Sequence, residues 1–281
     1  MATEAQARTI LITGCSSGIG HHAAHALAKR GWRVFATCRA EADCARLTDE
    51  GLESFRLDYQ DPASIHAAFD EAMARSRGRL DALFNNGAFA QPGAVEDLPT
   101  DALRAIFEAN FFGWHELTRR VIPVMRAQGA GRILQCSSVL GFSALRMRGA
   151  YIATKHALEG YTDTLRLELR GTGIHIVLIE PGPIKTRIRE NAQAHYERWI
   201  DRENTPWAEF YRTTLERRLY KKNPAPDVGE LSCRATTARV IAALDARRPQ
   251  PRYYVTRPTH LVGAMKRILP TRWMDAVMGS Q

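Results

Sequence analysis

The chain has 281 residues, of which 45% are hydrophobic and 25% charged, an ordinary globular composition that suits one large domain or a domain with an extension. No apolar run approaches the roughly 18 residues of a membrane-spanning helix, and the first residues lack the pattern of a secretory signal. Five cysteines without a C-x-x-C pair argue against a disulfide framework or a zinc site. We therefore expect no metal and a reducing, cytoplasmic location.

The formal net charge of +9 raises nucleic acid, a membrane surface or an anionic ligand as partners. The arginines are spread along the chain, with a denser basic share after residue 245. No basic stripe interleaved with aromatic residues is present, and neither is helix-turn-helix or zinc-finger spacing. We expect no nucleic-acid partner and interpret the charge as a surface that attracts a polyphosphate cofactor.

Residues 8–13 form a short apolar run bounded by glycine, which predicts a buried strand. The sequence TGCSSGIG follows at 13–20, and residues 21–31 then carry apolar positions at helical spacing. A strand, a glycine loop and a helix are the context of a nucleotide-phosphate site, because glycines allow close backbone approach and a helix start offers unpaired N–H groups. An ordinary strand-to-helix connection is the alternative.

The second expected strand, residues 32–39, ends at Arg39, and no acid follows until Glu41. In dinucleotide folds an acid at this place binds a ribose 2′-hydroxyl, whereas an arginine accommodates a 2′-phosphate. The strand end therefore favours NADP(H). A solvated loop arginine is the alternative interpretation.

Strands and helices alternate through the rest of the chain. Further strands are expected within 52–58, 79–88, 131–138, 174–182 and 252–256. Helices are expected at 41–49, from 62 onward, at 100–128, from 150 to about 170 and at 233–247. This alternation predicts an α/β fold, a doubly wound parallel sheet with helices on both faces.

The stretch SSVLGFSALRMRGAYIATK, residues 137–155, holds the most informative pair of side chains. If residues 150 onward are helical, Tyr151 and Lys155 lie one turn apart on one face. The lysine charge would favour phenolate and lower the tyrosine pKa, which suits proton donation in carbonyl reduction. The spacing alone is weak, since a surface lysine beside a half-buried tyrosine gives the same pattern.

Two segments after residue 186 fall outside the strand–helix pattern. Residues 187–230 mix charges with aromatic residues, and we interpret them as short amphipathic helices that form a lid over an apolar substrate site. Residues 257–281 carry apolar and basic residues, which predicts a helical extension packed on the body or on a subunit. A basic amphipathic contact with a membrane surface is the alternative for this tail.

Together these motifs resemble the short-chain dehydrogenase/reductase family over about residues 8–255. The resemblance rests on TGCSSGIG, NNGA at 85–88, YIATK at 151–155, PGPIKT at 181–186 and three single positions, Asp58, Asn110 and Ser138. The family usually has Asn-Asn-Ala-Gly where this chain has Asn-Asn-Gly-Ala, for which we expect a local backbone adjustment. The resemblance implies one Rossmann-type oxidoreductase domain over 1–281, a nicotinamide cofactor and a homodimer or homotetramer.

The resemblance also implies a role for each matching residue. Tyr151 would be the acid in reduction and the base in oxidation, Lys155 would lower its pKa and hold the nicotinamide ribose, and Ser138, at the family's offset from the tyrosine, would bond the substrate oxygen. Asn110 would hold a water in the proton relay. The other implied cofactor residues are Gly14, Ser16, Ser17, Gly18, Ile19, Gly20, Arg39, Asp58, Asn86, Gly87, Ala88, Pro181, Gly182, Ile184 and Thr186.

The nearest branch in pattern is that of hydroxysteroid and retinol dehydrogenases, which implies an apolar aldehyde, ketone, steroid-like or retinoid-like substrate. Its pocket wall is expected from apolar residues before the tyrosine, namely Leu140, Phe142, Leu145 and Met147. A 3-oxoacyl-thioester reductase is an alternative enzyme. A non-catalytic nucleotide-sensing protein is an alternative from another class, although such proteins usually lose the tyrosine or the lysine.

Overall fold

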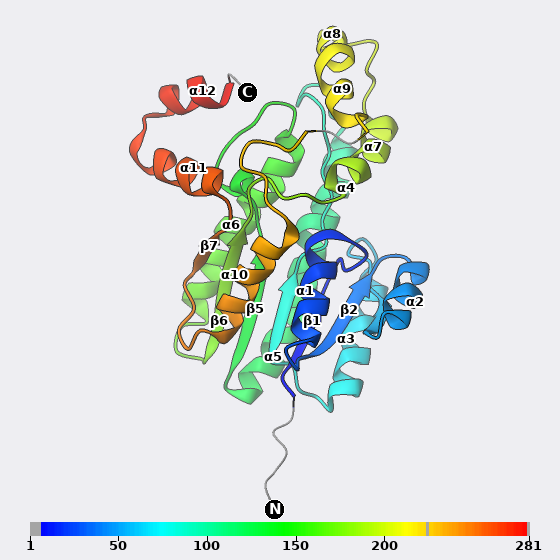
Figure 1. Cartoon of the computed structure of the whole chain (residues 1–281), viewed down its shortest axis with the longest axis vertical. Helices are drawn as coiled ribbons and strands as arrows, with labels where there is room; N and C mark the ends of the chain where they lie inside the picture. The colour runs from blue at the N-terminus through cyan, green and yellow to red at the C-terminus, as the bar shows by residue number, and fades with distance from the viewer. Residues whose placement is uncertain (1–6, 223–224, 280–281) are drawn as a thin grey trace, which may run out of the picture.

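A seven-stranded parallel sheet forms the centre of the computed structural model, which describes residues 7–222 and 225–279 (Figure 1). The strand order is β3-β2-β1-β4-β5-β6-β7. Continuous apolar runs make these strands, because both faces of the sheet are buried. Their bounds are β1 Thr9–Ile12, β2 Arg33–Cys38, β3 Glu53–Arg56, β4 Ala82–Asn85, β5 Gly131–Cys136, β6 Ile174–Glu180 and β7 Arg252–Tyr254.

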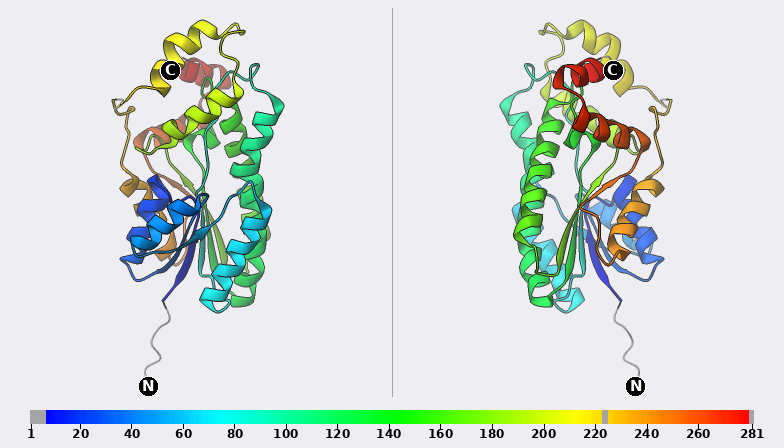
Figure 2. Two further views of the ribbon diagram at one scale, coloured as in Figure 1. Left: turned by 90° about the vertical axis from the view of Figure 1, so that its right-hand side faces the viewer. Right: turned by 90° about the vertical axis from the view of Figure 1, so that its left-hand side faces the viewer.

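Helices cover both faces of the sheet, as Figure 2 shows in its two side views. One face carries α1 Gly18–Ala28, α2 Glu41–Asp49 and α10 Cys233–Asp245. The other carries α3 Pro62–Ser76, α5 Gly113–Gln128 and α6 Gly149–Glu168. The predicted doubly wound parallel sheet is therefore confirmed. The strand order reverses between β1 and β4, the place where such sheets bind ligands beyond the carboxyl ends of their strands.

The single helix expected over 100–128 is wrong in its middle. The chain forms α4 Thr100–Phe107, then a π-helical turn, η1 Glu108–Phe112, and then α5. Asn110 lies in this turn, fully buried, and such turns are frequent at functional sites. The widened turn lets the Asn110 side-chain amide bond the backbone of Phe89, which lies in the loop after β4. Helical periodicity in the sequence does not reveal such a turn.

The described residues of the 187–230 segment form two helical stretches, as expected. One is α7 Ile188–Trp199, and the other runs without interruption through α8 Ala208–Phe210, η3 Tyr211–Leu215 and α9 Glu216–Leu219. Tyr196 and Tyr211 are fully buried between them, with rings at 5.8 Å, and Met147 joins the same apolar cluster. This cluster is separate from the main core, and the helices that carry most of it lie above the carboxyl edge of the sheet (Figure 1).

The C-terminal residues form α11 Arg257–Ile268 and α12 Thr271–Gly279. One side of α11 packs on the body, since a Cβ added at Gly263 would lie 2.6 Å from the Tyr254 ring. Leu261, Ile268 and Trp273 are nevertheless 62%, 78% and 64% exposed, so the subunit and membrane alternatives stay predictions. No helix within residues 7–222 and 225–279 is both long and apolar enough to cross a membrane.

Candidate active site

The expected site residues gather at one edge of the sheet, because carboxyl ends of parallel strands meet there. The glycine loop follows β1, Arg39 follows β2 and Asp58 lies two residues after β3. The NNGA motif ends β4 and continues beyond it, Ser138 comes two residues after β5, and residues 181–186 follow β6. Lys155 reaches this edge from α6, because its Nζ donates to the carbonyl oxygen of Cys136 at the end of β5, at 2.8 Å.

The glycine loop is packed too closely for side chains at two of its glycines. Gly14 has a φ of +67°, and a Cβ there would lie 2.5 Å from the Cα of Gly87. A Cβ at Gly20 would lie 2.4 Å from the carbonyl oxygen of Gly14. Ser17, the N-cap of α1, makes no side-chain capping bond. The start of α1 therefore fits the pyrophosphate of a dinucleotide, which binds free N–H groups and the positive end of the helix dipole.

We expect Gly14→Ala to destabilise the protein by about 2–4 kcal/mol, the sum of left-handed strain and overpacking. Gly31→Ala is the matched control, since Gly31 has a φ of +82° but nothing within 4 Å of an added Cβ, and it should cost only about 1 kcal/mol. Urea denaturation followed by circular dichroism measures both. Equal losses for the two variants would contradict the close packing of Gly14 on Gly87.

Asn86 holds the glycine loop instead of pointing away from it. Its side-chain Nδ2 donates to the carbonyl oxygens of Thr13 and Gly14, at 3.1 and 3.3 Å, and its backbone N–H donates to the Thr13 hydroxyl at 2.9 Å. Gly87 stands where the family usually has alanine, and its close approach to Gly14 explains why a small residue is needed there. Asn86 was expected among the cofactor residues, and that role remains a prediction.

Arg39 and Asp58 lie at the outer part of this edge. Arg39 is exposed directly after β2, free to meet a charged ligand group. The Asp58 carboxylate is partly buried and accepts from the Gln60 backbone at 3.0 Å. The expected roles of Arg39 and Asp58 toward the adenosine half of a dinucleotide remain predictions.

Residues 181–186 lie against the glycine loop on its other side. The Thr186 methyl group would be 3.2 Å from a Cβ at Gly18. The carbonyl oxygen of Pro181 accepts from the Val139 backbone at 2.7 Å, which ties this segment to the serine turn. Ile184 forms an isolated bridge with Leu231. The segment thus connects the glycine loop with the turn that carries Ser138.

Tyr151 and Ser138 are neighbours at the start of α6. Ser138 caps the short 3₁₀ helix η2 Val139–Gly141 by accepting from the Leu140 backbone at 3.1 Å. Tyr151 is 8% exposed and packs with Phe89 and Ile106. Burial raises the pKa of Tyr151 above its ordinary value, and a hydrogen bond with Ser138 acts against that rise.

Lys155 is 1% exposed, and its ammonium lies 4.3 Å from the centre of the Trp114 ring and 5.6 Å from that of Tyr151. Burial lowers the pKa of Lys155 to about 8. The pKa of Tyr151 is therefore shifted upward, whereas the sequence led us to expect a downward shift. Burial of the phenol raises this pKa, and the ammonium of Lys155 contacts the Cys136 carbonyl oxygen and the Trp114 indole. The phenol is protonated at pH 7, as a proton donor must be.

Asn110 makes its bonds to protein atoms. Its Oδ1 accepts from the Phe89 backbone N–H at 3.1 Å, and its Nδ2 donates to the Phe89 carbonyl oxygen at 2.9 Å. A longer bond of 3.4 Å reaches the Thr154 hydroxyl, one residue before Lys155. The amide thus holds the loop after β4 against α6, and its expected role in holding a water remains a prediction.

The structure brings only part of the expected pocket wall to the tyrosine. Leu140 packs on the apolar cluster that contains Tyr151. Phe142 instead lies beside the Tyr254 ring, at 5.4 Å. Met147, with a φ of +59°, is buried in the cluster of the 187–230 segment, and Leu145 is partly buried. In an irregular loop, the positions of apolar residues in the sequence do not determine where their side chains point.

Several residues at the site were missed from the sequence. Trp114 is nearly fully buried, and its Nε1 donates to the Gly87 carbonyl oxygen at 2.9 Å while its ring lies under Lys155. Helical spacing could have found it, since Trp114 follows Asn110 by one turn. Glu159 likewise follows Lys155 by one turn, and the hydroxyl of Ser137 donates to it.

A group of possible metal ligands lies between α1, which carries His21 and His25, and Glu50 at the end of α2. The Nε2 atoms of His21 and His25 are each 2.7 Å from the same carboxylate oxygen of Glu50. Arg46 already bonds the other oxygen of Glu50 at 2.6 Å. The carboxylate is therefore compensated by protein groups, and no role in the site follows from this cluster.

Known proteins share both the sequence pattern and the fold. Residues 8–197 match the family model described as short chain dehydrogenase. An uncharacterized oxidoreductase, YbbO of Escherichia coli K12, is 38% identical over 96% of this chain and 94% of its own length. Human 17-beta-hydroxysteroid dehydrogenase type 1 is 32% identical over 89% of this chain and 78% of its own length.

Solved structures agree with the fold. A short-chain dehydrogenase from Streptomyces avermitilis superposes with a TM-score of 0.76 at 27% identity, over 98% of this chain and all of that one (100%). One from Burkholderia phymatum, in complex with NAD, has a TM-score of 0.77 at 24% identity and covers 99% and 96% of the two chains. One from Burkholderia cenocepacia, in complex with NADP, has a TM-score of 0.74 at 21% identity, with 97% of each chain covered.

Proposed function

Because the chain belongs to the short-chain dehydrogenase family, we propose that it is an NADP(H)-dependent oxidoreductase that interconverts a carbonyl and an alcohol on an apolar substrate. The observation that carries the proposal is the group of a partly exposed Ser138 with the buried Tyr151 and Lys155 at the carboxyl edge of the sheet, beside a glycine loop that fits a dinucleotide. A non-catalytic nucleotide-sensing protein would not need these three side chains.

The side chains of the site account for the proton and for the developing charge. A bound nicotinamide supplies the hydride. Ser138 and Tyr151 are donors for a substrate oxygen that gains negative charge in reduction. Tyr151 transfers its proton to that oxygen. The ammonium of Lys155, still charged at pH 7 with a pKa of about 8, lies 5.6 Å from the centre of the ring that becomes the phenolate.

Arg39 supports the choice of NADP(H). It is exposed at the end of β2, where a 2′-phosphate would lie, and no acid precedes Glu41. Structures of the same fold bind NAD in one case and NADP in another, so the nicotinamide cofactor follows from the family and the preference rests on Arg39.

The apolar residues around Tyr151 support an apolar substrate. Phe89, Ile106 and Leu140 pack with it, and the 187–230 segment, which we propose as the lid, lies over the same edge of the sheet (Figure 1). Among curated relatives, one is named Retinol dehydrogenase 8, from Homo sapiens. We further propose a cytoplasmic homodimer or homotetramer.

A panel of aldehydes, ketosteroids and retinal, followed by absorbance loss at saturating NADPH or NADH, tests the proposed function. We expect reduction of at least one class, with kcat/KM for NADPH about 100-fold above that for NADH. Arg39→Asp should reverse this preference, because the new carboxylate repels a 2′-phosphate and accepts a 2′-hydroxyl.

Arg170→Asp is the matched control, since Arg170 is exposed after the far end of α6, and it should leave the cofactor preference unchanged. An unchanged preference in Arg39→Asp would dismiss Arg39 as the selector. Absence of turnover with every carbonyl and both cofactors would reject the oxidoreductase.

A further inference from the structure

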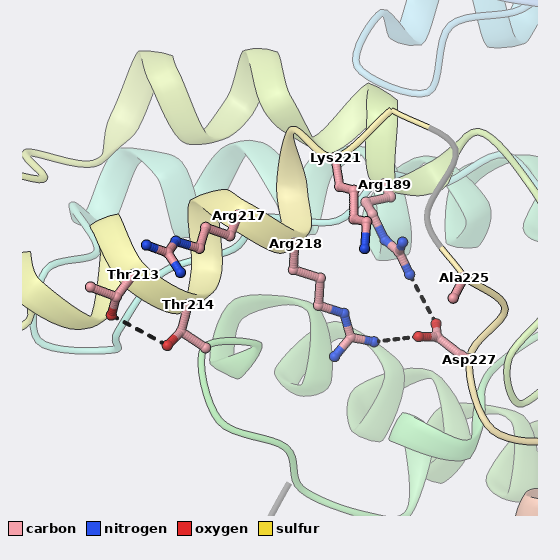
Figure 3. A pocket seen from close by; sticks show the side chains of 8 residues that line it. All are labelled: Arg189, Thr213, Thr214, Arg217, Arg218, Lys221, Ala225 and Asp227. Atoms are coloured by element: carbon pink, nitrogen blue, oxygen red, sulfur yellow. Dashed lines mark hydrogen bonds and ion pairs between the residues drawn. The ribbon is translucent and has the colours of Figure 1, made fainter.

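A basic pocket of about 380 Å³ lies between α7, the stretch from η3 to α9, and the loop that precedes α10. Figure 3 shows its lining side chains, which come from three separate parts of the segment after residue 187. They comprise four cations, one carboxylate and three small residues, namely Arg189, Arg217, Arg218, Lys221, Asp227, Thr213, Thr214 and Ala225. No catalytic residue is among them.

Positive charge exceeds negative charge in this pocket. Asp227 accepts from Arg189 at one carboxylate oxygen and from Arg218 at the other, at 2.9 Å each (Figure 3). A guanidinium has five N–H donors, so each arginine keeps donors beyond its bond to Asp227. Arg217 and Lys221 add charge that this carboxylate does not balance.

Arg148 connects this pocket with the catalytic tyrosine. It is the N-cap residue of α6, three residues before Tyr151, or about 4.5 Å along the helix axis. The charged groups close enough to alter its pKa are Arg189, Arg218 and Asp227, and burial together with the two arginines lowers that pKa to about 10. Arg148 is not among the side chains that line the pocket, but its charge lies close to those of Arg189, Arg218 and Asp227, and it precedes the tyrosine by less than one helical turn.

The guanidinium of Arg148 is poorly compensated by the protein. It makes one long hydrogen bond, 3.3 Å, to the Met147 carbonyl oxygen, and no carboxylate lies within ion-pair distance of it among residues 7–222 and 225–279. A partly buried cation without a partner is costly, and an anionic ligand would remove much of this cost.

The phosphates of the cofactor have sites elsewhere on the edge. The glycine loop at the start of α1 fits the pyrophosphate, and Arg39 after β2 fits a 2′-phosphate. The pocket instead belongs to the segment that we propose as the substrate lid, and α8 and α9 lie well above α1 and α2 in Figure 1. The anion for this pocket is therefore sought in the substrate.

We propose that the substrate carries an anionic group, a carboxylate, sulfonate or phosphate, which binds Arg148 with Arg189 and Arg218 while its carbonyl lies at Tyr151. This inference rests on the proposed oxidoreductase function. The proposed substrate is amphipathic and not purely apolar. An apolar chain connects its anionic group with its carbonyl.

A series of ω-oxo acids with four to twelve carbons, each compared with its methyl ester, tests the proposal in an NADPH assay. The esters carry the same aldehyde without the charge, and the series allows for an unknown distance between the two ends. We expect kcat/KM of the best acid to exceed that of its ester by about 30-fold, mainly through KM, as for a charge-assisted bond.

Arg148→Met should remove this preference while the ester keeps its kcat/KM within a few-fold, and Arg148→Lys should restore part of it. Arg218→Met serves the same purpose if Arg148→Met does not fold. Arg212→Met is the matched control, because Arg212 lies in the same segment, 73% exposed and bonded to Glu209, and it should keep the preference.

The unreactive decanedioate gives a readout independent of turnover. It should raise the Tm of the wild type more than its dimethyl ester does, and it should lose this effect in Arg148→Met. Equal kcat/KM for acids and esters would overturn the proposal while leaving the oxidoreductase intact. A raised KM for NADPH in Arg148→Met, with no change in the preference for acids over esters, would show that the pocket binds the cofactor. That result would also overturn the proposal.

Discussion

Tyr151→Phe is expected to lower kcat for carbonyl reduction by about 10³-fold, the size of effect typical of a lost general acid. The variant removes one hydroxyl and keeps the ring, which fills the same space beside Phe89 and Ile106. The Kd for NADPH, measured by quenching of protein fluorescence, and the Tm should therefore stay close to those of the wild type.

Tyr161→Phe is the matched control for this experiment. Tyr161 lies on the same helix, and its hydroxyl is within 3.1 Å of the His115 Nδ1 atom, so its loss also removes one phenolic hydrogen bond. It should cost about 1 kcal/mol of stability and leave kcat unchanged. If Tyr151→Phe retained kcat within about threefold of the wild type, another group would have to be the proton donor.

The parts of the fold that were predictable depend on local pattern. Apolar runs such as residues 8–13 and 174–180 indicate strands buried on both faces, and glycines at 14, 18 and 20 indicate a tight turn before a helix. Each signal is contained in a few neighbouring residues, so the alternation of strands and helices could be derived without knowing any tertiary contact.

The parts that were not predictable depend on contacts between distant residues. The Tyr151 pKa is set by burial among residues from several elements. The turn at Asn110 depends on the Phe89 backbone, twenty-one residues earlier in the chain. Arg148 has no ion-pair partner among the described residues because the tertiary structure places no carboxylate within ion-pair distance of its guanidinium. A motif identifies such a residue, whereas its environment comes from the tertiary structure.

The second large effect is expected at Arg252, an arginine on β7 that connects this strand with β6 and with α6, the helix that carries Tyr151 and Lys155. Arg252 on β7 donates from Nη1 to Glu180 on β6, at 2.6 Å, and also to Glu159 on α6. Glu180 is fully buried, and within the described part of the chain its Oε2 has no partner. Burial and the charge of Glu159 raise the pKa of Glu180, and Arg252 opposes that rise.

Arg252→Met is therefore expected to destabilise the protein by about 3 kcal/mol at pH 7, the cost of leaving buried carboxylates without their cation. Thermal denaturation would show this as a fall in Tm of about 5 °C. Arg104→Met is the control, since Arg104 and its partner Asp101 are each 72% exposed, and it should cost less than about 1 kcal/mol.

The pH dependence distinguishes a charge effect from simple loss of packing. In the wild type the pKa of Glu180 is already raised to about 8, and in Arg252→Met it rises further. Between these two folded pKa values the folded variant keeps a proton that the folded wild type has released, so the loss of stability relative to the wild type grows as pH rises through that interval. The loss should be smaller near pH 6 than near pH 9, and adding Glu180→Gln should remove most of this slope. A loss of equal size at both pH values would mean that Arg252 acts through packing and not through its charge.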